Sequence, residues 1–339
     1  MPDKQFITPI IITPGDPAGI GPEIALKALL GNDDLRAQSV LIGDKSHLSS
    51  LAEALDISCE FAKWTPGDPL YFDKINLAEI SWPEAVISGA PSTANAPMVI
   101  EAIATAAHLA LAGDVRAIVT CPIAKSTLYE AGFQYPGHTE YLGALSSDKS
   151  AIMMLANSEL RVVPATIHIA LSDVPKQINE NDLSELIEDV AGALQQDFGL
   201  SSPRIGVCGL NPHAGENGAM GDEEQTIVMP AIEHASDRLE GKAIITGPHP
   251  ADTLFHQEKR RQFDCIIGMY HDQVLIPVKT LDFHGSVNIT LGLDFIRTSP
   301  DHGTAFDIAG KGIARDDSLR QAMATALKMA EHRYGVQDG

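Results

Sequence analysis

The fold is decided near the start of the chain, at residues 6–23, which read FITPIIITPGDPAGIGPE. Residues 6–13 are rich in isoleucine and have the length and apolar character of a buried strand. Residues 14–21 carry three glycines and two prolines, which is typical of a tight loop. Pro22 suits the first turn of a helix, and Glu23 suits the positive end of the helix dipole. The stretch therefore predicts a strand, a tight loop and a helix.

The same alternation of short apolar runs, turns and helical patterns continues to the end of the chain. The expected strands are 39–42, 117–120, 151–155, 160–169, 204–209, 242–245, 264–269 and 286–290, and the expected helices are 46–55, 92–111, 182–198, 222–239 and 316–332. Alternating strands and helices predict an α/β fold with largely parallel sheets. No Ser/Gly-rich linker marks a boundary, which favours two lobes joined by passing strands.

Composition limits the possible partners. The 339 residues are enough for about two domains. With 24 Lys and Arg against 45 Asp and Glu, the net charge is −21, which disfavours nucleic acid and anionic lipid. The most apolar long stretch, 96–112, contains Glu101 and His108, so we expect no membrane span. The four cysteines form no CxxC motif, and we interpret them as reduced packing residues of a cytoplasmic protein.

Three histidines share one context, because each follows an expected buried strand. His168, His213 and His271 lie at or just past the carboxyl ends of these strands, the edge where open α/β sheets bind ligands. Three converging imidazoles suit Zn²⁺ or a similar ion with positions left open for substrate. Spacings of 45 and 58 residues form no local metal motif, so ordinary hydrogen-bonded strand ends remain an alternative. Asp272 would be a second-shell partner of His271.

One segment differs in charge from the rest of the acidic chain. Residues 276–315 contain four basic and four acidic residues. Lys279 and Arg297 lie there among neutral hydrogen-bonding side chains, which suits a phosphate or a carboxylate. Ordinary surface pairing is the alternative. The glycines of residues 14–21 do not match the dinucleotide fingerprint GxGxxG, so we interpret that loop as a structural turn beside a site.

Six stretches together resemble the 4-hydroxythreonine-4-phosphate dehydrogenases of vitamin B6 synthesis. They are ITPGDPAGIGPE (12–23), GHTEYL (137–142), CGLNPHAGENGAMGDEE (208–224), PADTLF (250–255), MYHDQ (269–273) and VNITLGLDFIRTSPDHGTAFDIAGKG (287–312). The resemblance implies NAD-dependent oxidation of 4-phosphooxy-L-threonine to a β-keto acid. Loss of CO₂ would then leave 3-amino-2-oxopropyl phosphate, a step in pyridoxine 5'-phosphate synthesis.

The resemblance also implies an architecture. The family is similar to the isocitrate and isopropylmalate dehydrogenases, with two α/β/α lobes and a cleft between them. The first lobe is expected to comprise residues 1–140 plus about 282–339, and the second about 141–281. The family works as a homodimer whose sites draw residues from both chains.

The family's functional residues fall on matching positions of this sequence. The resemblance implies His168, His213 and His271 as ligands of a divalent ion (Zn²⁺, Mg²⁺ or Co²⁺). The implied substrate residues are His138, Thr139, Lys279, Asn288 and Arg297. Residues 302–311 resemble the adenosine loop of isopropylmalate dehydrogenases, which implies cofactor contacts from His302, Gly303 and Asp307. A carboxylate at Asp307 would repel the extra phosphate of NADP and so favours NAD.

The general base and some alternatives stay open. Asp252 or Asp272 would take the proton from the substrate hydroxyl. The run TCPIAK at 120–125 is looser than the Thr-Gly-Pro-x-x-Lys expected of the family, which leaves the role of Lys125 open. The same motifs fit a sister enzyme acting on D-threonate or D-erythronate 4-phosphate. A phosphate acyltransferase of similar fold and a non-catalytic metal-binding protein are further alternatives.

Overall fold

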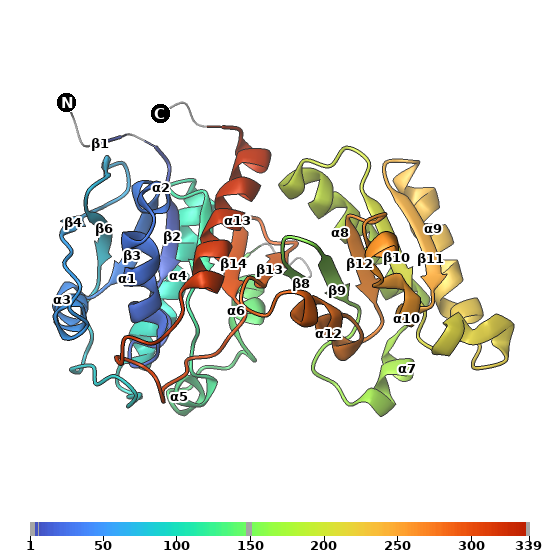
Figure 1. Ribbon diagram of the computed structural model, residues 1–339, viewed down its shortest axis with the longest axis horizontal. Helices are drawn as coiled ribbons and strands as arrows, with labels where there is room; N and C mark the ends of the chain where they lie inside the picture. The colour runs from blue at the N-terminus through green and yellow to red at the C-terminus, as the bar shows by residue number, and fades with distance from the viewer. Residues whose placement is uncertain (1–3, 6, 147–150, 337–339) are drawn as a thin grey trace. The chain divides into compact units, whose positions relative to one another are not determined.

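The computed structural model describes residues 4–5, 7–146 and 151–336 (Figure 1). The chain divides into two compact units, one made of residues 1–151 and 293–339 and the other of residues 152–292. Both units are mixed α/β, which confirms the expected fold class. No helix among the described residues is both long and apolar enough to cross a bilayer.

The first unit is built on parallel strands. Its sheet has the order β14 (Ile296–Pro300), β7 (Ala117–Thr120), β2 (Ile10–Thr13), β3 (Ser39–Gly43), β6 (Ile75–Glu79) and β4 (Phe61–Lys63). Each neighbouring pair runs parallel. A separate antiparallel pair joins β1 (Lys4–Gln5) to β5 (Leu70–Tyr71). The Ile-rich run thus forms a buried strand, as predicted, although β2 begins at Ile10 and not at the expected residue 6.

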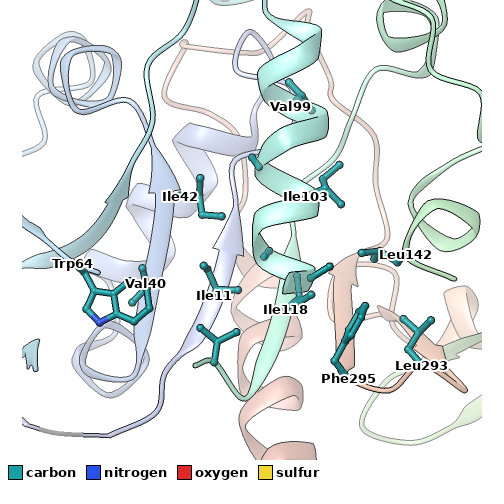
Figure 2. Close-up of a cluster of buried hydrophobic side chains, with 14 of the residues drawn as sticks. Ile11, Val40, Ile42, Trp64, Val99, Ile103, Ile118, Leu142, Leu293 and Phe295 are labelled. Carbon is teal, nitrogen blue, oxygen red and sulfur yellow. The ribbon is translucent and has the colours of Figure 1, made fainter. Parts of the chain in front are cut away.

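Helices cover both faces of this sheet. They are α1 (Gly21–Leu30), α2 (Asp33–Ala37), α3 (Lys45–Ala54), α4 (Ala96–Ala112), α5 (Lys125–Glu130), α6 (His138–Leu145) and α13 (Asp317–Tyr334). Ile11 and Ile118 of the strands pack with Ile103 of α4 in one core cluster (Figure 2). Successive strand residues face opposite ways, and Ile10 and Ile12 are also fully buried, so the other face is covered as well.

The second unit mixes parallel and antiparallel strands. Its order is β11 (Ile244–His249), β10 (Arg204–Cys208), β12 (Cys265–Gly268), β9 (Arg161–Pro164), β8 (Ile152–Ala156) and β13 (Val287–Leu291). The pairs from β11 to β9 are parallel, and β8 is antiparallel to both β9 and β13. Its helices are α7 (Val174–Gln177), α8 (Glu180–Phe198), α9 (Met229–Leu239), α10 (Ala251–Leu254), α11 (Gln257–Arg260) and α12 (His271–Leu281).

Two expected elements of this unit are shorter than the sequence pattern suggests. The strand expected at 160–169 ends at Pro164, because the chain then leaves the ladder: the Thr166 hydroxyl donates to the Met269 carbonyl at 2.7 Å. The helix expected at 222–239 begins as a π-helical turn at Glu224–Val228 before α9 continues it. Both irregular segments lie close in sequence to predicted site residues.

Candidate active site

The three predicted metal histidines follow neighbouring parallel strands of the second unit. His168 lies past the end of β9 and His213 past β10, and His271 is the first residue of α12, three residues past the end of β12. Because β10, β12 and β9 are parallel neighbours, their carboxyl ends share one edge of the sheet. The three residues therefore follow strands whose carboxyl ends share one edge of the sheet, while their role in a common site stays a prediction.

Two of these histidines lie ring to ring. The ring centroids of His168 and His271 are 5.8 Å apart, with the planes tilted by 43°. Nδ1 of His271 lies 2.6 Å from Oδ1 of Asp272, which fixes the ring and leaves Nε2 for another partner. Over the described ranges 7–146 and 151–336, no three His, Cys, Asp or Glu side chains gather closely enough to hold a metal ion. The three-histidine metal site therefore stays a prediction.

His213 lies in an unusual backbone turn. Residues 213–217 all have positive φ, between 43° and 77°, although only Gly215 lacks a side chain. Left-handed backbone costs about 1–2 kcal/mol for each residue with a Cβ, so the turn needs outside support. Glu224, almost fully buried, accepts from the backbone N of Asn211 at 2.7 Å and from its Nδ2 at 3.0 Å. Glu224 therefore holds the entry to this turn.

The predicted base candidates are solvent-exposed in the second unit. Asp252 is in α10, which follows β11, and Asp272 is the second residue of α12. Since β11 is parallel to β10, Asp252 lies at the same sheet edge as His213. The other predicted residues of this unit are Lys279, whose Nζ lies 5.9 Å from the ring centroid of Phe283, and Asn288 on β13.

In the first unit, the buried Arg297 and the partly buried His138 lie close enough to interact electrostatically. Arg297, on β14, is 4% exposed, and its Nε and Nη2 donate to Thr120 Oγ1 at 3.1 and 2.6 Å. Burial lowers the pKa of the Arg297 guanidinium to about 10, while the charge of Glu140 acts in the opposite direction. Burial, together with the charges of Arg297 and Lys125, holds the pKa of His138 well below its ordinary value. This group suits an anionic ligand.

Several predicted site residues carry buried polar atoms with no hydrogen-bond partner in the part of the chain that the structure describes. These atoms are His138 Nε2, Asn288 Oδ1 and His302 Nε2. Buried polar atoms are nearly always hydrogen-bonded, so each of these atoms is a candidate contact for a bound ligand. Thr139, in the first turn of α6, is partly buried, while Gly303 and Asp307 are exposed on the loop between β14 and α13.

Comparison with known proteins decides the family. The family model described as pyridoxal phosphate biosynthetic protein PdxA matches residues 35–326. The chain belongs to this family. It is 48% identical to a protein of Paracoccus denitrificans and 46% identical to one of Caulobacter vibrioides, covering 96% of this chain and 98% of each relative. Both are named 4-hydroxythreonine-4-phosphate dehydrogenase, so the predicted resemblance is confirmed.

A solved structure agrees with this assignment to the PdxA family. The crystal structure of 4-hydroxythreonine-4-phosphate dehydrogenase from Klebsiella pneumoniae superposes with a TM-score of 0.86 at 38% identity. The match covers 95% of this chain and 98% of that one. The family's overall chain fold is therefore retained in this member.

Three residues beside Arg297 and His138 were missed as site candidates by sequence reasoning. Thr120 accepts hydrogen bonds from Nε and Nη2 of Arg297, and Glu140 acts electrostatically on the same guanidinium. Lys125 acts electrostatically on His138, although its motif looked too loose to assign a role. A Thr at the end of a predicted strand and a Glu two residues after His138 were the available signals. Neither signal distinguishes an inward-pointing side chain from an ordinary surface residue.

The depressed pKa of His138 predicts a pH dependence of stability. The unfolded chain binds a proton on this imidazole below about pH 6.5, whereas the lowered pKa means that the folded protein binds it only at lower pH. Unfolding therefore becomes easier as the pH falls below that value, by up to about 1.4 kcal/mol per pH unit. We expect His138→Gln to lose this part of the loss of stability in acid. Above about pH 7.5, its free energy of unfolding should change with pH as it does in the wild type.

Urea unfolding between about pH 5 and 7.5 measures this difference. His332→Gln, at an exposed position of α13, is the matched control and should follow the wild type throughout. The prediction would be contradicted by a difference in the free energy of unfolding between wild type and His138→Gln that did not change with pH.

Proposed function

We propose that this chain is an NAD-dependent dehydrogenase that oxidises 4-phosphooxy-L-threonine at its secondary alcohol. The hydride goes to the nicotinamide and the hydroxyl proton to a protein base, giving a β-keto acid. Loss of CO₂ then leaves 3-amino-2-oxopropyl phosphate, on the route to pyridoxine 5'-phosphate. One observation carries the proposal. In this PdxA-family chain, the nearly buried Arg297 lies close enough to His138 to lower its pKa, and Nε2 of His138 has no hydrogen-bond partner within the described residues.

The substrate carries a phosphate, a carboxylate and a hydroxyl. We assign its contacts to His138, Thr139, Lys279, Asn288 and Arg297. A guanidinium removed from water binds a phosphate or carboxylate strongly, since competing water is excluded. Neutral His138 and the Asn288 amide supply hydrogen bonds without adding charge.

A divalent ion is the proposed partner of the histidines. The donors fit such an ion, since neutral imidazole is a common ligand of Zn²⁺ and Co²⁺, whereas Mg²⁺ favours oxygen. His168 and His271 have adjacent rings, and His213 follows the neighbouring strand β10. The ion would supply Lewis-acid polarisation of the substrate hydroxyl. Asp252 or Asp272 would accept the proton, and both carboxylates are accessible to solvent for passing it on.

The dinucleotide is assigned to the loop between β14 and α13. His302 would contact it through the buried Nε2 that lacks a partner among the described residues, and the open space at Gly303 permits close approach of the backbone. Asp307 would bind the ribose hydroxyls. When bound, NAD supplies the hydride acceptor.

The assembly and location follow as further proposals. A homodimer with sites shared between chains is supported by Ile276 and Phe283, which are each 62% exposed on or beside α12. Large exposed apolar side chains that lie seven residues apart would be covered by association with a second copy. We propose that the two compact units are the two lobes expected from the sequence. Free thiols at all four cysteines support a reducing compartment, the cytoplasm.

The test is NADH formation by the purified protein with 4-phosphooxy-L-threonine. We expect turnover that a chelator abolishes and that added Zn²⁺ or Co²⁺ restores. D-threonate and D-erythronate 4-phosphates serve as competing substrates, and faster turnover of either would shift the assignment to the sister enzyme. Absence of NADH with every substrate and metal would overturn the proposed reaction.

The proposed contact of Asp307 with the ribose predicts a change in the KM for NAD. Replacing Asp307 with Ala should raise the KM for NAD about 10- to 100-fold, because hydrogen bonds to a charged group are worth about 1.5–3 kcal/mol. The KM for the phosphorylated substrate should stay nearly constant, and discrimination against NADP should weaken. Initial-rate kinetics with both dinucleotides measures this. Glu53→Ala, at an exposed site on α3, is the control, and an unchanged KM for NAD would exclude the ribose role.

A further inference from the structure

Helix α1 binds the loop between β14 and α13 through two side chains one turn apart. Glu23 accepts from the backbone N of Gly310 and of Ala314, each at 3.1 Å. Lys27 donates from Nζ to the carbonyls of Gly312 and Ala314, each at 2.8 Å. The two side chains also pair with one another, with Nζ and Oε1 2.8 Å apart. One helical turn therefore holds the backbone of a segment nearly 300 residues further along the chain, at separations of 285 to 291 residues.

The burial of Glu23 makes the geometry of its contacts important, while Lys27 is partly exposed. Glu23 is fully buried, and a buried carboxylate is tolerated only when it is paired and hydrogen-bonded. Both of its oxygens are used by the loop, and one also by Lys27. A buried ion pair adds little net stability, since desolvation offsets the attraction. Its main consequence here is to restrict where the loop backbone can lie.

The loop itself has little internal structure. Residues 301–316 contain no helix or strand, and their internal backbone bonds include turns such as Lys311 N to Ile308 O at 3.2 Å. A second contact holds the start of the loop, where Ile20 N donates to Thr304 O at 2.9 Å. Asp307 lies between these two attachments. A long irregular loop depends on such contacts for a single conformation.

We propose that Glu23 and Lys27 are positioning residues that hold this loop in the conformation that binds the dinucleotide, and thereby set the affinity for NAD. The inference rests on the proposed function, because it assigns the loop to the cofactor. Both residues act through the loop backbone. The Glu of the GIGPE motif thus has a role at a segment far from it in sequence.

The experiment compares Lys27→Met, which keeps the aliphatic stem, with Lys27→Arg, which keeps the donors and the charge. Direct titration with NAD should show about tenfold weaker binding for Lys27→Met, since a less ordered loop must be fixed on binding. Lys27→Arg should retain most of the affinity. Glu23→Gln should weaken NAD binding similarly, while kcat at saturating NAD and the KM for the phosphorylated substrate change less than about twofold.

Arg260→Met is the matched control. Arg260 is a buried cation of the second unit that pairs with Glu159, so its loss should lower the melting temperature without changing NAD affinity. Hydrogen exchange of the backbone amides of Gly310 and Ala314 measures the order of the loop independently of activity. It should accelerate in Lys27→Met and Glu23→Gln and stay unchanged in Arg260→Met.

The outcomes separate this inference from the proposed function. If wild type binds NAD and the Lys27→Met variant binds it equally well, with only a lower melting temperature, the pair is structural and the inference fails alone. If wild type neither binds NAD nor forms NADH, both fail. Where Glu23→Gln does not fold, Lys27→Met against Lys27→Arg decides the question.

Discussion

Replacing His271 with Ala is expected to reduce NADH formation by roughly a thousandfold and to remove the bound metal. Loss of Lewis-acid stabilisation of a developing alkoxide costs several kcal/mol, and each 1.36 kcal/mol corresponds to a factor of ten in rate. Because the His168 and His271 rings lie 5.8 Å apart, His168→Ala should have a similar effect. The double variant should be little worse than either single one, since residues that act as a unit are not additive.

Metal analysis of the purified protein and single-turnover kinetics measure these effects. His108→Ala, at an exposed site on α4, should retain both metal and activity. Circular dichroism should show that the sheet survives in the His271→Ala variant, because the ring is not part of the core. Near-native turnover by that variant in the presence of a chelator would refute the metal assignment.

The second large effect is expected at Arg297. Arg297→Met should lower kcat/KM for the phosphorylated substrate by two to three orders of magnitude, because removing a buried charge partner costs about 2–5 kcal/mol. Arg297→Lys should recover only part of the loss, since an ammonium cannot reproduce the two-donor contact with Thr120. The affinity for NAD should change little in either variant.

Initial-rate kinetics with substrate and with inorganic phosphate as a competitor measures this loss. Thr120→Val is the informative companion, since it removes the hydroxyl that accepts from Nε and Nη2 of Arg297 and leaves the charge in place. Its kcat/KM for the phosphorylated substrate should lie between the values of the wild type and of Arg297→Met. A KM for substrate that stayed constant in Arg297→Met would show that this guanidinium does not bind the anion.

The most apolar strands could be predicted because they depend on local pattern, whereas β4, β6 and β14 were missed. The isoleucine run at 10–13 has no polar side chain that could face water before Thr13, so it must be buried on both faces. The histidines were located because each follows such a run, and parallel neighbours place these positions together. Two of the stretches that resemble the family, at 208–224 and 269–273, include His213 and His271.

The side-chain network around Arg297 could not be predicted in the same way. Thr120 and Glu140 become partners of Arg297 only when β14 lies beside β7 and α6 packs near their ends. The left-handed turn at 213–217 was also hidden, because only Gly215 signals positive φ. The other four residues are held there by surrounding contacts, which sequence-local reasoning cannot include.

The order of strands in the sheet of the first unit determines when this unit can fold during synthesis. Its sheet needs β14, and helix α13 packs on β14 and β7, so the C-terminal segment completes a structure begun at β2 (Figure 1). The second unit is one uninterrupted segment, residues 152–292. On the ribosome, the middle of the chain can therefore complete its own sheet first. The N-terminal strands must wait, with the unsatisfied edge of β7 exposed to chaperones, until the last fifty or so residues emerge.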